Sequence, residues 1–192
     1  MAEPCAFAVD VARAYEYASG GRLRRGLECI FSPGLQALGV YRFGRWSRSL
    51  PLPIRLFTDA AYFLLNIPVK IFWGIELPRS AVIGPGLYIG HFGGIVISPG
   101  AVFGRNCNLS HGVTVGLSGQ GERRGIPIIG DDVYMAPGAK LFGKIKIGNN
   151  CKIGSNAVVY KDIPDNAVVV LNPGFTIISM AGNRNTASPP AN

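Results

Sequence analysis

The sequence contains two histidines, His91 and His111, whose positions in a repeat make them candidates for chemistry. Each follows the aliphatic opener of a six-residue repeat by two positions, His91 after Ile89 and His111 after Leu109. Imidazole titrates near neutral pH, so a histidine can take a proton from a substrate hydroxyl. The pattern predicts a general base, and the alternative is a pair of ordinary surface or core histidines.

The repeat around these histidines has a fixed period of six residues. Each hexapeptide opens with an aliphatic or other large apolar residue, and most carry a small or β-branched residue at the fifth place. The openers are Ile83, Ile89, Ile97, Phe103, Leu109 and Val115, and later Ile129, Met135, Leu141, Ile147, Ile153 and Val159. A short fixed period of this kind predicts a β-solenoid, in which each coil packs on its neighbours.

One break in the repeat lies beside the first histidine. The early hexapeptides stay in register only if two extra residues lie within residues 91–96. This segment contains Gly93 and Gly94, and a glycine pair permits a bulge that re-aims nearby side chains. With three hexapeptides in a coil, the bulge predicts that His111 lies one coil above His91, about 5 Å away.

A second interruption covers residues 117–126, which are glycine-rich and charged. Such a composition predicts a loop that projects from a corner of the solenoid. Pro164 and the polar tail from Gly182 are predicted to end the repeat. We therefore expect a β-helix domain over residues 76–173 and a C-terminal tail over residues 174–192.

The N-terminal region, residues 1–75, lacks hexapeptides and has the apolar spacing of helices. Helices are predicted over residues 9–18, 35–50 and 54–73, with a turn at residues 32–34. Pro68 is expected to kink the last helix. The region is therefore predicted to form a short helical cap.

The last predicted helix is rich in apolar residues, but Arg55, Asp59 and Lys70 interrupt it, which argues against a membrane span. Two arrangements of residues 35–73 remain open. The helices pack on the base of the solenoid and on each other, or their basic and aromatic face contacts an anionic membrane surface.

The net charge and the cysteine spacing restrict the kinds of ligand, metal site and compartment that we expect. The net charge of the 192-residue chain is +8, but the basic residues are spread along the sequence. This spread indicates an anionic ligand or surface and gives no reason to expect a nucleic-acid partner. The four cysteines show no metal-ligand spacing, so no metal is expected. Residues 1–19 lack the apolar run of a signal peptide, and we expect a reduced, cytoplasmic protein.

Several segments together resemble the left-handed β-helix acyltransferases, within them the serine acetyltransferase-like branch. They are residues 32–38, 74–78, 89–97, 108–114 and 161–164. Residues 89–97 and 108–114 look like the O-acetyltransferases of polysaccharide biosynthesis. The resemblance implies a mainly β, left-handed parallel β-helix with a short helical cap. It also implies a homotrimer that binds acetyl-CoA as co-substrate in a groove between neighbouring prisms.

The resemblance assigns roles to individual residues. His91 falls on the family's catalytic histidine and is predicted to be the general base, and Glu76 stands where a catalytic aspartate normally orients that histidine. His111 is expected to bind the acceptor or to stabilise the oxyanion. Gly116, Pro137 and Ser155 stand at positions that face the cofactor, and Lys161 offers a cation for its phosphates.

The sequence departs from true serine acetyltransferases where those enzymes hold the amino acid. Gly90 replaces the aspartate that precedes the catalytic histidine, and Gly125 and Ile126 replace an Arg-His pair, although Arg123 and Arg124 lie nearby. We therefore expect a sugar hydroxyl as the acceptor, with free serine as the alternative. A non-catalytic hexapeptide scaffold or binding protein is the second alternative.

Overall fold

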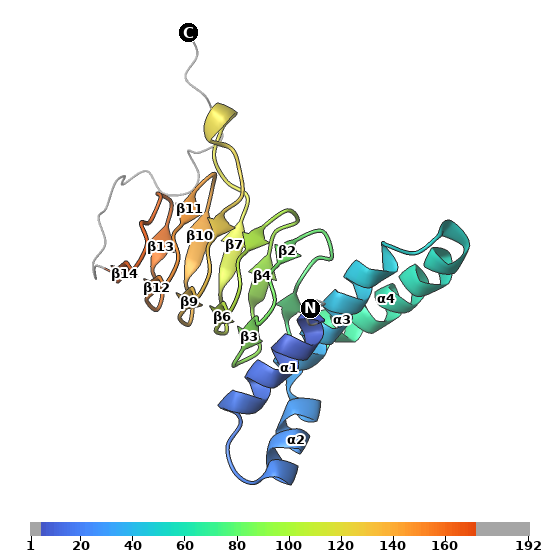
Figure 1. The fold of residues 1–192 in the computed structure, drawn as a ribbon. Coiled ribbons are helices and arrows are strands. Elements are labelled where there is room, and N and C mark those ends of the chain that lie inside the picture. Colours follow the sequence, from blue (N-terminus) through green and yellow to red (C-terminus); the bar gives the residue numbers. More distant parts are fainter. Residues whose placement is uncertain (1–4, 172–192) are drawn as a thin grey trace, which may run out of the picture.

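The computed structural model describes residues 5–171, and Figure 1 shows a helical region followed by a β-helix. The four helices are α1 (Ala6–Tyr17), α2 (Arg22–Phe31), α3 (Pro33–Ser47) and α4 (Leu52–Phe72). Pro68 lies inside α4 without ending it. Among the described residues, no helix combines the length and the hydropathy that a membrane span requires.

Two features of the helical region differ from the prediction. Helix α2 was not predicted, although Leu23, Leu27 and Ile30 have the i, i+4, i+7 spacing of a helix. The predicted turn at residues 32–34 instead begins α3. The hydroxyl of Ser32 accepts a hydrogen bond from the backbone N–H of Leu35, and Pro33 occupies the first helical position. Serine at the N-cap followed by proline favours this helix start.

The β-helix consists of three parallel sheets whose strands follow one another in turn along the chain. The first sheet contains β1 (Ile75–Glu76), β4 (Ile95–Ile97), β7 (Thr114–Gly116), β10 (Lys140–Phe142) and β13 (Val158–Val159). The second contains β2 (Val82–Ile83), β5 (Val102–Phe103), β8 (Ile128–Ile129) and β11 (Lys146–Ile147). The third contains β3 (Tyr88–Ile89), β6 (Asn108–Leu109), β9 (Tyr134–Met135), β12 (Lys152–Ile153) and β14 (Val168–Val169). The fold is the predicted left-handed parallel β-helix.

The core confirms the six-residue repeat. Every predicted opener from Ile83 to Val159 is buried, with at most 6% of its surface exposed. The small fifth-place residues Ala101, Cys107 and Ala139 are fully buried beside them. Neighbouring coils therefore pack through narrow apolar layers, in which a residue of the wrong size would leave a void or overlap.

The register confirms the bulge and corrects the end of the repeat. Ile89 pairs with Leu109 but Ile97 pairs with Val115, so the two extra residues lie between these pairs. Pro164 does not end the repeat, because β14 pairs with β12 through Ile153 and Val169. This last coil contains two residues fewer than the regular eighteen. The tail predicted over residues 174–192 lies outside the described residues.

A buried ion pair attaches the helices to the β-helix. The Arg42 side chain donates to Asp10 at 2.8 Å and to the backbone carbonyl oxygens of Ile83 and Gly84 at 2.6 and 2.7 Å. Asp10 is 1% exposed, and its carboxylate also accepts hydrogen bonds from the backbone N–H groups of Gly86 and Leu87. Arg42 is thus engaged within the protein and does not contribute to a free basic face.

Candidate active site

The bulge places the two histidines beside each other on successive coils. Their ring centroids are 5.9 Å apart with an interplanar angle of 74°. Gly93 and Gly94 have φ values of 104° and 64°, in the region that disfavours other residues. The backbone N–H of Gly112 donates to the carbonyl oxygen of Gly93 at 2.8 Å, which closes the bulge onto the next coil.

The same column continues along the β-helix. In the third sheet, Leu109 pairs with Met135 and Met135 with Ile153, so the residues two positions later also align. We call this edge, between the third and first sheets, the histidine corner; its residues are His91, His111, Pro137 and Ser155. The predicted site residues Pro137 and Ser155 therefore follow the histidines on the next two coils. Both imidazoles are exposed and accessible to a substrate.

The structure pairs Glu76 with a lysine. Oε1 of Glu76 accepts a hydrogen bond from Nζ of Lys70 at 2.6 Å, and both side chains are nearly half exposed. Among the described side chains, no hydrogen bond joins Glu76 to His91. In the sequence, Lys70 stands out only as an interruption of an apolar segment, so this partner was not predicted. The signal for this contact is the spacing, since Lys70 lies in the last turn of α4, six residues before Glu76 on β1.

The interrupting segment forms the predicted loop. Ser118 and Gly125 exchange backbone hydrogen bonds of 3.1 and 3.0 Å, and the short 3₁₀ helix η1 (Gly121–Arg123) lies at the tip. Arg124 is exposed next to this turn. We call this edge, between the first and second sheets, the loop corner. Figure 1 shows the loop projecting away from the coils.

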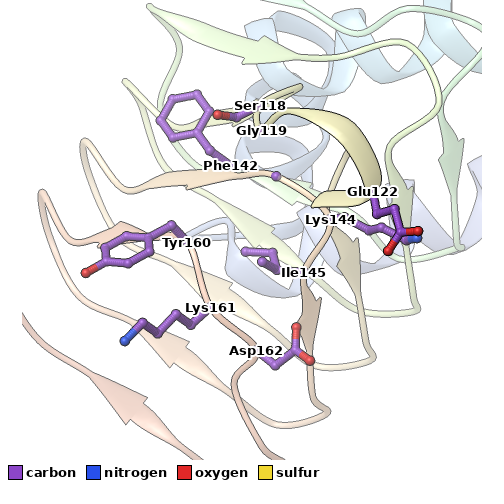
Figure 2. Close-up of a pocket in the computed structure, with 10 residues that line it drawn as sticks. Ser118, Gly119, Glu122, Phe142, Lys144, Ile145, Tyr160, Lys161 and Asp162 are labelled. Atoms are coloured by element: carbon purple, nitrogen blue, oxygen red, sulfur yellow. The ribbon is translucent and has the colours of Figure 1, made fainter. Parts of the chain in front are cut away.

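A groove of about 790 Å³ opens beneath the loop. Figure 2 shows the rings of Phe142 and Tyr160 on one side, and Glu122 and Lys144 on the other. Lys161, a predicted cofactor residue, also lines this groove. The aromatic rings suit a ligand that carries a ring, and the two lysines, which share the groove with Glu122 and Asp162, offer cations for phosphate groups.

Gly116 lies beside the groove and supports its wall. A Cβ atom added to Gly116 would meet the Phe142 ring at 2.5 Å, so glycine allows this ring to lie against the backbone. Lys140, in contrast, donates to the hydroxyl of Thr114 at 3.0 Å on the outer face of the first sheet. It is held there by this bond and by the backbone carbonyl of Gly112.

Within one chain, the candidate residues fall into two groups. The histidine corner and the loop corner lie at opposite edges of the first sheet, because β4, β7 and β10 run from one to the other. The structure brings His91 and His111 together but keeps Arg124 and Lys161 apart from them. Among residues 5–171, no group of three or more potential metal ligands occurs.

Comparison with known proteins finds similarity to serine acetyltransferases. No protein-family model matches the chain. It is 35% identical over 155 residues to the serine acetyltransferase of Synechococcus elongatus, a match that covers 80% of this chain and 61% of the relative. It is 40% identical over 154 residues to that of Mycobacterium tuberculosis, covering 79% and 64%. The chain thus spans less than two thirds of the length of these curated relatives.

Solved structures give the same result. Serine acetyltransferase isoform 3 of Entamoeba histolytica, in complex with cysteine, aligns with a TM-score of 0.70 at 27% identity, over 90% of this chain and 59% of that one. The Neisseria gonorrhoeae enzyme, in complex with serine, aligns with a TM-score of 0.68 at 29% identity, over 88% and 66%. The chain is therefore similar, in sequence and in fold, to serine acetyltransferases over part of their length.

Proposed function

We propose that this protein is an acetyl-CoA-dependent O-acetyltransferase that transfers an acetyl group to a hydroxyl. The observation that carries the proposal is the pair of exposed histidines at a bulged corner of a β-helix that resembles serine acetyltransferases. A β-helix that served only as a scaffold would not require two adjacent imidazoles at this break in its register.

The proposed reaction needs one base. His91 takes the proton of the acceptor hydroxyl while the oxygen attacks the thioester carbonyl carbon. The carbon–sulfur bond of the resulting tetrahedral intermediate breaks, and the proton passes from His91 to the departing CoA sulfur. His111, with its ring 5.9 Å from that of His91, holds the acceptor or the developing oxyanion. Glu76 would orient His91 once it exchanges its bond with Lys70 for one with the imidazole.

The proposed assembly is a homotrimer. A site that uses both corners needs the histidine corner of one chain and the loop corner of its neighbour, since one chain separates them. Acetyl-CoA would then lie between chains, near Gly116, Pro137, Ser155 and Lys161, with Arg124 of the loop available to the acceptor. The side chain of Arg123, which was also predicted to bind the acceptor, lies outside the part of the chain that the structure describes. The free cysteines support the expectation of a reduced compartment, the cytoplasm.

We propose serine as the acceptor, because the relatives described above are serine acetyltransferases. This revises the preference for a sugar hydroxyl that the sequence favoured. The sugar remains the second candidate, on one observation: Gly90 and Ile126 stand where those enzymes would hold the amino acid.

Release of CoA thiol from acetyl-CoA, measured with serine and with a panel of sugars, tests the proposal. We expect a serine kcat/KM of about 10⁴ M⁻¹s⁻¹ or more, within the ordinary enzyme range. Turnover with sugars but not with serine would show that a sugar hydroxyl is the acceptor. Absence of turnover with every hydroxyl acceptor, at a concentration where the protein is assembled, would contradict the acetyltransferase itself.

A further inference from the structure

Helix α4 has an exposed apolar side that nothing in the described chain covers. Six of its residues define what we call the α4 apolar face, and each is between 52% and 80% exposed: Leu56, Phe57, Phe63, Leu64, Ile67 and Ile71. At 3.6 residues per turn, these residues fall within one half of the helix circumference. Figure 1 shows the α3–α4 pair projecting away from the β-helix.

The charged residues of α4 make hydrogen bonds within the protein, and Lys70 borders the apolar face, three residues after Ile67. The carboxylate of Asp59 accepts hydrogen bonds from the Ser47 hydroxyl at 2.8 Å and from Arg79. Lys70 donates to Glu76. The α4 apolar face is thus bordered by a cation, because the Lys70 side chain is 44% exposed.

The chemistry of this face favours a lipid bilayer over a protein as its occupant. Specific protein interfaces carry roughly one hydrogen bond per 100–200 Å², and the side chains of the α4 apolar face offer none. The interior of a bilayer requires no hydrogen bonds from the face that enters it.

The charge around the face selects the kind of bilayer. Arg45 and Arg48, both exposed, lie at the C-terminal end of α3, the helix against which α4 packs. Exposed basic residues beside an apolar helical face are attracted to anionic headgroups. We propose that the α4 apolar face docks this protein on the surface of a membrane that contains anionic lipid. The inference stands independently of the proposed acetyltransferase activity.

Sedimentation with vesicles tests the docking surface. The full-length protein is mixed with vesicles of phosphatidylcholine alone and of phosphatidylcholine with phosphatidylglycerol. We expect it to sediment with the anionic vesicles and to be released by high salt, which screens the headgroup charge. Leu64→Glu is expected to lower vesicle binding about tenfold or more, since it removes apolar surface from the face and adds a negative charge.

Val168→Glu is the matched control, because Val168 is 68% exposed on β14 and Leu64 is 71% exposed. This control should bind the vesicles as the wild type does. If the circular dichroism spectrum of Leu64→Glu shows that it does not fold, Ile71→Gln tests the same face.

Two results would overturn the proposal. The first is a wild-type protein that does not sediment with anionic vesicles, or a folded Leu64→Glu variant that binds them unchanged. The second is light scattering in which Leu64→Glu lowers the mass of the assembly while vesicle binding stays the same. The second result would show that the α4 apolar face binds another copy of the chain.

Discussion

At the scale of single residues, the histidine corner is the part of the candidate site that the sequence predicted best. The spacing of His91 and His111, together with the glycine pair between them, was enough to place both rings on successive coils. The partner of Glu76 could not be predicted in this way. The Lys70–Glu76 bond joins the end of a helix to the first strand, and its formation depends on the direction in which α4 meets β1.

Two substitutions separate the role of Glu76 from that of its lysine partner. If Glu76 orients the base, Glu76→Gln should lower kcat while KM for the acceptor stays similar. Lys70→Gln should leave kcat within about twofold, because a half-exposed ion pair contributes only about 0–1 kcal/mol. Steady-state kinetics of the two variants provides the test. An equal loss of kcat in both would show instead that the ion pair positions the carboxylate.

At the scale of elements, the repeat could be predicted and the connections between unlike elements could not. The apolar residue that opens each hexapeptide is itself a buried residue. The core of the β-helix could therefore be predicted from the local sequence pattern. In helix α2, Leu23, Leu27 and Ile30 have helical spacing but all three side chains are exposed, so this spacing does not mark a buried face. The short last coil was missed because Pro164 suggested an end, although β14 still completes a parallel pair.

The attachment of the helical cap to the β-helix depends on Asp10. Asp10→Ala leaves Arg42 without its counter-charge at a largely buried position, where the Arg42 side chain is 14% exposed. Removal of one partner from a buried pair typically costs about 3–5 kcal/mol, so we expect the midpoint of thermal unfolding to fall markedly. Arg45→Ala, at an exposed position on the same helix, is the control. It should change the free energy of unfolding by less than about 0.5 kcal/mol.

The stability that the contact between α3 and α4 contributes should depend on pH. Hydrogen bonds from Arg79 and from Ser47 lower the pKa of Asp59 to about 2. An unfolded aspartate has a pKa of about 3.9, so the folded protein binds this proton less readily than the unfolded chain does. The stabilising contribution is therefore complete above about pH 4 and is lost as the pH falls toward 2. Thermal unfolding of the wild type and of Asp59→Asn across this range should show a difference that disappears at the acid end. A difference that is constant with pH would contradict this assignment.

At the scale of the whole molecule, the proposed active site depends on neighbouring chains. The groove beneath the loop and the histidine corner lie at opposite edges of the first sheet, and only an adjacent prism can bring the two together. We expect light scattering at micromolar concentration to give the mass of a trimer of the 20.4 kDa chain. A stable monomer that still turns over acetyl-CoA would contradict an active site shared between chains.

The substitution His91→Ala tests the central claim most directly, with serine-dependent release of CoA thiol as the measurement. If His91 is the general base, kcat should fall by about 10² to 10⁴, while the thermal midpoint stays near that of the wild type. The fold should survive because the side chain is exposed and lies outside the packed core. A His91→Ala protein that keeps its stability and more than half of its kcat would contradict the mechanism, and the paired histidines would then be structural.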